Sequence, residues 1–281
     1  MKTVLSIAIL AIGAAALVLG VSSCKRSKAS NIITDESNQD YASMFGGELD
    51  SFKAKGGNTI DIFSIKHGSL AIRSANKWIY VDPVTKAAQP VTDYTDLPKA
   101  DYILITHDHG DHLDPAAIAQ LATPDTRIIA NPGSVQKASD AAKGEGVTSS
   151  PEVIGLGNGE GLTTAEGWNI DAVPAYNSSP EKQNFHPQGV GNGYLVTIDG
   201  FRIYVAGDTE DIPELADLND VDVAFLPCNL PYTMTPEQCA NAARMFSPKV
   251  LFPYHYGETD VQQVVNLLSG TATDVRIRPY K

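Results

Sequence analysis

The stretch that most constrains the fold and chemistry of this chain is the heptapeptide 106–112, Thr-His-Asp-His-Gly-Asp-His. It places three of the six histidines of the 281-residue chain within six positions, beside two carboxylates. The preceding run 102–105, Tyr-Ile-Leu-Ile, predicts a buried strand. Asp114 and Pro115 predict the N-cap and first position of a helix. The histidines are therefore expected on a tight loop at the carboxyl end of a strand, where side chains can converge on one point.

Imidazoles and carboxylates at this density suit a borderline transition metal such as zinc. His107 and His109 are two residues apart and can chelate one ion, whereas Asp111 and His112 can bind a second. The simpler interpretation is a polar turn whose histidines face solvent or cap the helix. That interpretation explains a lone histidine better than three histidines interleaved with acids, so we predict a metal site.

The beginning of the chain has the pattern of an export signal. Lys2 precedes an apolar run over 4–21 and small residues that end at Cys24. This order is typical of a secretory signal peptide, and its end resembles a bacterial lipobox. We predict that 1–23 is a lipoprotein signal peptide and that Cys24 is lipidated, which would anchor an exported protein to a membrane on its periplasmic or cell-surface side. A plain transmembrane anchor and an ordinary signal peptide are the alternatives.

Composition divides the rest of the chain into two parts. Residues 24–57 are polar and rich in Ser, Asn and Asp, which predicts a tether and lead-in. Residues 58–281 are enough for one compact domain with a sizeable core.

The net charge of −12 disfavours nucleic acid as a partner. The expected partners are a small-molecule substrate and, through the lipid on Cys24, the membrane. Cys228 and Cys239 are predicted to be buried free thiols, although an oxidising compartment would permit a disulfide.

The domain begins with strand patterns and then alternates strands with helices. Asp199-Gly200 between two β-rich runs predicts a tight hairpin. Thr235 and Gln238 form a capping-box pattern at a helix start, and Asn131-Pro132 predicts another capped helix. The fold class is therefore α/β (α+β), with two mixed sheets packed together and helices outside.

Three ordered motifs resemble the metallo-β-lactamase superfamily: His107-x-His109-x-Asp111-His112, then Gly207-Asp208-Thr209 after the hairpin, then His255 after a late strand. The segment 65–69, Ile-Lys-His-Gly-Ser, with Val81-Asp82-Pro83, is similar to the branch containing ascorbate-6-phosphate lactonase-like and N-acyl-phosphatidylethanolamine phospholipase D-like hydrolases. The resemblance implies an αββα sandwich with the site along one edge, where loops from both sheets meet.

The same resemblance implies a role for each matching residue. The first ion would be held by His107 and His109, the second by Asp111, His112 and His255, and Asp208 would bridge both. One position departs from the pattern, because Asn177 stands where a third histidine for the first ion is expected. We predict that His186 folds back to supply the missing nitrogen. Otherwise His186 is an exposed loop residue, and the first site is weak or empty.

The expected activity is hydrolysis by a zinc-activated hydroxide on an ester, lactone or phosphodiester-type substrate, with one or two Zn²⁺ ions and with Mn²⁺ or Fe possible. Asp111 or Asp208 would steer the proton. His67 either faces the site or donates to a carboxylate such as Asp82, and Tyr232 either stabilises an oxyanion or packs in the core. An iron-dependent oxygenase or oxidoreductase on this fold and a non-catalytic metal-binding lipoprotein are the alternatives.

Overall fold

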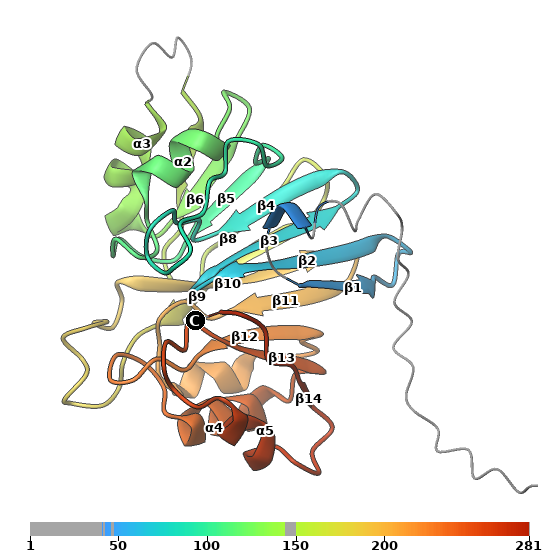
Figure 1. Cartoon of the computed structure of the whole chain (residues 1–281), viewed down its shortest axis with the longest axis vertical. Coiled ribbons are helices and arrows are strands. Elements are labelled where there is room, and N and C mark those ends of the chain that lie inside the picture. The colour runs from blue at the N-terminus through green and yellow to red at the C-terminus, as the bar shows by residue number, and fades with distance from the viewer. Residues whose placement is uncertain (1–40, 42, 46–47, 144–149, 281) are drawn as a thin grey trace, which may run out of the picture. The chain divides into compact units, whose positions relative to one another are not determined.

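The structure, a computed structural model, describes residues 41, 43–45, 48–143 and 150–280 (Figure 1). The predicted signal peptide 1–23 and the predicted lipidation site Cys24 lie outside the described residues. So do residues 24–40, 42 and 46–47 of the predicted tether 24–57. Among the described helices, none combines the length and apolar composition needed to span a membrane.

Two sheets of seven strands each make up the described domain, and in both the spatial order of strands follows the chain. In the first sheet, β1 to β4 are antiparallel and β4 to β7 are parallel. Its strands are β1 (Leu49–Lys53), β2 (Thr59–Lys66), β3 (Ser69–Ser74), β4 (Lys77–Val81), β5 (Tyr102–Ile105), β6 (Arg127–Ala130) and β7 (Glu152–Gly155).

The second sheet repeats this plan, with β8 to β11 antiparallel and β11 to β14 parallel. Its strands are β8 (Gly161–Thr163), β9 (Asn169–Ala175), β10 (Gly191–Ile198), β11 (Phe201–Val205), β12 (Val223–Pro227), β13 (Val250–Tyr254) and β14 (Asp274–Val275). After residue 48, the described helices are α2 (Pro115–Leu121), α3 (Val135–Ala142), α4 (Pro236–Phe246) and α5 (Gln262–Leu267), with 3-10 turns η1 (Pro132–Ser134) and η2 (Pro213–Asp217).

Side-chain alternation along the strands builds the layers. In β4, Ile79 and Val81 belong to the core shared with the second sheet, whereas Trp78 and Tyr80 belong to the core that contains residues of α2 and α3. Helix α4 covers the second sheet, where the Phe246 ring lies 5.8 Å from that of Tyr204. Figure 1 shows α2 and α3 beyond one sheet and α4 and α5 beyond the other. The predicted αββα sandwich is confirmed.

Most local signals in the sequence operate as expected. Asp199 and Gly200 both have positive φ in the β10–β11 hairpin, and Thr235 forms its capping box at α4. Asp114 caps α2 by accepting from the Ala116 N–H. The predicted cap at Asn131 is wrong. Its side chain makes no cap hydrogen bond and donates instead to the Val190 carbonyl at 2.8 Å, and the chain passes through η1 before α3 begins.

The folded domain extends before the predicted boundary at Asn58. Strand β1 pairs with β2 along its whole length, and the ring of Phe45 packs 4.8 Å from that of Phe63. The polar sequence of β1 concealed it, because Asp50 is a buried acid that accepts hydrogen bonds from Arg276 and Arg278 near the other end of the chain. Cys228 and Cys239 are buried free thiols, as predicted.

Candidate metal centre

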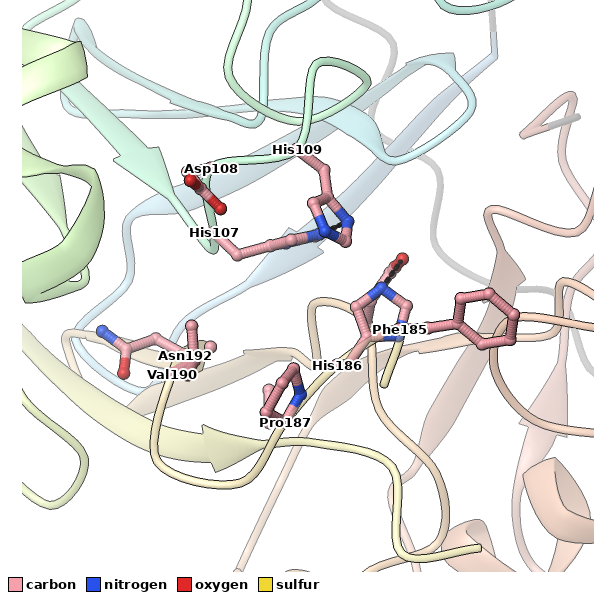
Figure 2. Close-up of a pocket in the computed structure, with 11 residues that line it drawn as sticks. His107, Asp108, His109, Phe185, His186, Pro187, Val190 and Asn192 are labelled. Carbon is pink, nitrogen blue, oxygen red and sulfur yellow. Dashed lines mark hydrogen bonds and ion pairs between the residues drawn. The ribbon is translucent and has the colours of Figure 1, made fainter. Parts of the chain in front are cut away.

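Three histidines form a first cluster at the edge where strand ends from both sheets meet. Ligand nitrogens of His107, His109 and His186 all lie within 4.8 Å of one another, and His107 Nε2 is 3.0 Å from His109 Nδ1. Figure 2 shows the first two coming from the loop after β5 and His186 coming from the loop between β9 and β10. The structure therefore brings His186 to the position where a third nitrogen was predicted.

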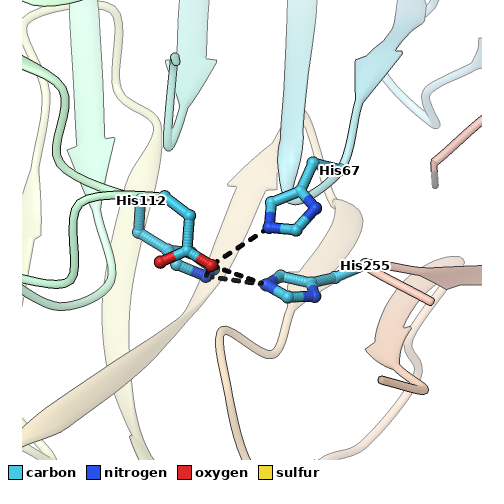
Figure 3. Close-up of side chains that lie close together, drawn as sticks. His67, His112 and His255 are labelled. Atoms are coloured by element: carbon cyan, nitrogen blue, oxygen red, sulfur yellow. Dashed lines mark hydrogen bonds and ion pairs between the residues drawn. The ribbon is translucent and has the colours of Figure 1, made fainter. Parts of the chain in front are cut away.

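A second cluster lies beside the first and contains His67, Asp111, His112 and His255. The Nε2 atoms of His112 and His255 are 3.0 Å apart, and Asp111 Oδ2 lies 3.1 Å from His67 Nε2 and 3.5 Å from His255 Nε2 (Figure 3). His67 is in the turn between β2 and β3, and His255 follows β13. His67 combines the two alternatives, because it faces this cluster and its Nε2 lies at hydrogen-bond distance from a carboxylate, which is that of Asp111.

Asp208 lies between the two clusters. Its Oδ2 is 3.0 Å from His186 Nε2, whereas its Oδ1 is 3.5 Å from His112 Nε2 and 3.7 Å from His255 Nε2. Oδ1 is buried and has no hydrogen-bond partner among the described residues. A buried, unpartnered carboxylate oxygen is costly, and a cation between Oδ1 and the imidazole nitrogens would satisfy it. The donor set thus fits one ion in each cluster with Asp208 reaching both.

Two glycines allow this close packing. Gly207 has φ +65°, and a Cβ there would lie 2.7 Å from the Asn192 carbonyl oxygen. A Cβ on Gly68 would lie 3.1 Å from His112 Cε1. The glycine before Asp208 therefore lets β11 turn toward the centre, and Gly68 makes room for an imidazole ring.

Three residues of the centre have left-handed backbone conformations that non-glycine residues rarely adopt. The φ angles are +51° for His67, +42° for Asp82 and +47° for His255. Each such residue costs on the order of 1 kcal/mol or more, and such strain concentrates at functional sites. The surrounding sheets therefore hold these side chains in place at the expense of local backbone energy.

Four of the histidines have a defined partner at Nδ1, so that Nε2 faces the centre. The partners are Thr106 for His107 at 3.0 Å, Asp82 for His112 at 2.7 Å, Asn229 for His255 at 3.0 Å and Asn177 for His186 at 3.2 Å. The contacts of His107 and His112 are of the kind that orients metal-binding imidazoles, because the Thr106 hydroxyl and the Asp82 carboxylate can accept from an Nδ1–H. The contacts of His255 and His186 are to the amide nitrogens of Asn229 and Asn177. The alternative that paired Asp82 with His67 is wrong, because Asp82 accepts from His112 and from Thr106. Sequence reasoning missed Thr106 and Asn229.

The charges around the centre are arranged as a cation requires. Burial, aided by the charge of His112, lowers the pKa of His107 well below its usual value. Burial alone would raise the pKa of Asp208, but His255 and His112 outweigh it and lower that pKa well below the usual range. For His112 burial lowers the pKa, yet Asp208 and Asp82 raise it well above normal. Without a cation, a proton on His112 balances Asp208, and a bound metal would take its place.

A cleft of about 390 Å³ opens onto the centre, within the range of small-molecule sites. Its lining comprises His67, His109, Asp111, Phe185, His186, Asp208, Asn229, Tyr232 and His255. Tyr232 therefore borders the cleft, and at 45 % exposure it is not a core residue. A smaller space of about 30 Å³, lined in part by Phe185, Pro187 and Val190, adjoins His107 and is large enough for about one water molecule (Figure 2).

Replacing Asp82 with asparagine is expected to weaken metal binding roughly 10- to 100-fold, as does the loss of other carboxylate partners of ligand histidines. The reason is that Asp82 is fully buried and holds both His112 Nδ1 and the Thr106 N–H. Competition with a chelating indicator dye would measure the affinity. The exposed acid Asp125 provides the matched Asp→Asn control. An unchanged affinity in D82N would contradict the positioning role of Asp82.

Comparison with known sequences agrees with the geometry. The model of the beta-lactamase superfamily domain matches residues 77–256. A UPF0173 metal-dependent hydrolase of Thermococcus kodakarensis is 33 % identical over 226 residues, which cover 76 % of this chain and 94 % of that protein. A UPF0173 metal-dependent hydrolase of Anoxybacillus flavithermus is 30 % identical and covers 75 % of this chain and 94 % of its own length.

Solved structures show the same fold. A candidate metal-dependent hydrolase from Parabacteroides distasonis is 49 % identical with a TM-score of 0.77, covering 84 % of this chain and all of that one. A metallo hydrolase from Ignicoccus hospitalis is 25 % identical with a TM-score of 0.61, covering 78 % of this chain and 94 % of that one. With its two ligand clusters in the expected order on this fold, the chain belongs to the metallo-β-lactamase superfamily and is related to its metal-dependent hydrolases.

Proposed function

We propose that this protein is a hydrolase that uses two divalent cations, zinc first among the candidates, to cleave an ester, lactone or phosphodiester-type bond. The observation that carries the proposal is the position of Asp208. Its two oxygens face two different groups of imidazole nitrogens, and one of these oxygens is buried without a partner. Two-metal hydrolytic sites use such a bridging carboxylate to hold their cations about 3.5–4 Å apart.

Each cluster would hold one ion. The first set is His107, His109 and His186, the second set is Asp111, His112 and His255, and Asp208 belongs to both. Zinc bound in this way would lower the pKa of a water molecule to about 7 and polarise the oxygen of the group to be cleaved. The carboxylate of Asp111, which lines the cleft, would steer an attacking water or accept its proton.

The residues at the cleft opening have roles of their own. His67 and Tyr232 both line the cleft and carry groups that can donate a hydrogen bond. Charge that builds on the oxygen of the cleaved group would be stabilised by such donors. We therefore assign substrate orientation and oxyanion stabilisation to His67 and Tyr232, and proton transfer to Asp111 and Asp208.

Iron chemistry is the second candidate. Imidazole and carboxylate ligands also suit iron, and a diiron β-hydroxylase from Streptomyces venezuelae has this fold, with a TM-score of 0.59 at 16 % identity. A purely structural ion is less well supported, because structural sites close their coordination, whereas an open cleft reaches both clusters here.

Metal removal tests the proposal. Protein purified without added metal would be analysed for bound metals, stripped with a chelator and assayed on ester, lactone and phosphodiester substrates. We expect about two ions per chain, loss of hydrolysis on stripping, and recovery with Zn²⁺ or Mn²⁺. Bound iron with oxygen-dependent turnover would support the oxygenase instead. Hydrolysis that survives complete metal removal would overturn the proposed function.

A further inference from the structure

Exposed apolar side chains gather beside the metal centre. The described residues include seven exposed large hydrophobic side chains, and four of them come from the two loops after β9 and β12: Phe185, Val190, Leu230 and Tyr232. Phe185, at 38 % exposure, and Tyr232, at 45 %, both line the cleft together with the metal-binding residues. A concentration of exposed apolar surface at a cleft marks a binding site.

The two aromatic residues form a pair. Their ring centroids are 5.2 Å apart, with the ring planes at 79° in an edge-to-face arrangement. Phe185 directly precedes His186 in the chain, and Figure 2 shows its ring extending to one side of the His186 ring. An apolar group bound against this pair would thus lie next to the group being cleaved.

Hydrogen bonds hold the loop of Phe185 to the loop of Tyr232. The Asn177 side chain, only 1 % exposed, donates to the carbonyls of Lys182 at 3.1 Å and Tyr232 at 2.8 Å. Lys182 Nζ donates to the Thr233 carbonyl at 2.7 Å. The aromatic pair is therefore preorganised, which reduces the entropic cost of binding. Asn177, at the position of the expected histidine, acts here as a tie between the loops.

The charges in the cleft indicate an uncharged substrate. Of the described residues that line it, none is lysine or arginine, while Asp111 and Asp208 are both acids. Recognition of a phosphate beyond the reacting group uses arginine, lysine or a helix N-terminus. The two proposed cations would contact the reacting group itself, so a further anionic group elsewhere on the substrate would find no lysine or arginine side chain in the described lining of this cleft.

We infer that Phe185 and Tyr232 form a subsite for the apolar acyl or alkyl group of an uncharged carboxylic ester or lactone. The inference rests on the proposed hydrolase function and narrows its substrate class. It predicts that catalytic efficiency rises with the length of the apolar group, and that phosphate mono- and diesters are poor substrates.

A chain-length series tests the subsite. For the metal-loaded wild type, kcat/KM should rise about fourfold for each methylene buried, or roughly sixteenfold from 4-nitrophenyl acetate to the butyrate. 4-Nitrophenyl phosphate and bis(4-nitrophenyl) phosphate should be hydrolysed more slowly than the butyrate. In Phe185→Ala the length dependence should flatten while hydrolysis of the acetate persists. In Tyr232→Ala the length dependence should flatten as well, together with a lower rate for every ester, because this variant also loses the proposed oxyanion donor.

Two further variants separate ring contact from other effects. Tyr232→Phe keeps the ring and should keep the wild-type length dependence, even if loss of the hydroxyl lowers kcat. Leu267→Ala removes a comparably exposed side chain on α5 and should leave the whole profile unchanged. A flat profile in the wild type, an unchanged profile in both alanine variants, or a preference for the phosphate esters would overturn the subsite while leaving the hydrolase function standing.

A binding measurement tests the subsite without turnover. In metal-free protein, 1-octanol should give stronger saturation-transfer NMR signals than 1-butanol, and Phe185→Ala should lose this difference. Absence of hydrolysis for every substrate would overturn the proposed function. The octanol result would then still decide the subsite, since equal signals for the two alcohols would contradict it.

Discussion

Replacing Asp208 with asparagine is expected to lower kcat/KM roughly a thousandfold or more, because a bridging carboxylate supports several kcal/mol of the transition-state stabilisation in a two-metal site. Asparagine keeps the shape of the side chain but removes its negative charge and one of the oxygens that face His186 and His112. We expect the variant to retain fewer metal ions than the wild type. Kinetics on the best ester substrate and metal analysis would measure both effects.

The controls distinguish loss of the metal site from unfolding of the protein. Metal-free D208N should unfold at a lower temperature than metal-free wild type, because it loses one partner of the buried Asp208–His112 pair, but it should keep a single cooperative unfolding transition. Asp140→Asn makes the same chemical change on the exposed surface of α3 and should leave activity and metal content unaltered. Wild-type turnover in D208N would refute the bridging role of Asp208.

Replacing Glu210 with glutamine is expected to destabilise the protein by about 3–5 kcal/mol, the usual cost of removing one partner of a buried ion pair. The Glu210 carboxylate is fully buried, lies 3.0 Å from Lys182 Nζ and accepts from the Ser179 N–H at 2.7 Å. It also accepts from Gln238 of α4 at 3.1 Å. It therefore fastens the loop that carries His186 to the helix layer.

The loss of stability caused by E210Q should be larger at neutral pH than at acid pH. Burial would raise the pKa of Glu210, but hydrogen bonds from Ser179, Lys182 and Gln238 outweigh it and lower this pKa to about 2. A lowered folded-state pKa gives stability that is fully present above the unfolded value near 4.3 and is lost as pH falls toward 2. The stability difference between wild type and E210Q should therefore be largest near pH 7 and narrow below about pH 4.5.

Urea denaturation of the metal-free proteins between pH 7 and about pH 3 would measure this difference. Glu152→Gln is the matched control, because Glu152 pairs with Arg127 at 2.9 Å but its side chain is 56 % exposed. Exposed pairs contribute at most about 1 kcal/mol. If E210Q were no less stable than E152Q, this result would contradict the proposal that the Glu210–Lys182 pair holds the loop that carries His186.

The sequence alone predicted those parts of the site in which the functional side chains and their secondary structure lie within a few consecutive residues. The histidine-rich loop is contained within seven residues and follows a recognisable strand, so its elements could be predicted without long-range contacts. Gly207 before Asp208 and the Asp199-Gly200 turn are likewise local signals. The positions of Asp208 and His255 beside this loop required the resemblance to a known family, because they are about 100 and 150 residues away along the chain.

What could not be predicted depends on contacts between distant segments. Asp82 was recognised at a strand end, but its pairing with His112 is set by how β4 and β5 align in the sheet. Asn229 carries no sequence signal, since an asparagine in a loop is usually a turn residue. Strand β1 was missed because its buried acid is paired with arginines more than 220 residues away.

The strand order has a consequence for how the protein matures. The chain builds one sheet from its first half and the other from its second half; His107 and His112 come from the former, Asp208 and His255 from the latter. The bridged pair of ions that we propose would need donors from both halves. Loading of both ions would then follow docking of the halves, and bound cations would favour the docked form over any partly assembled intermediate.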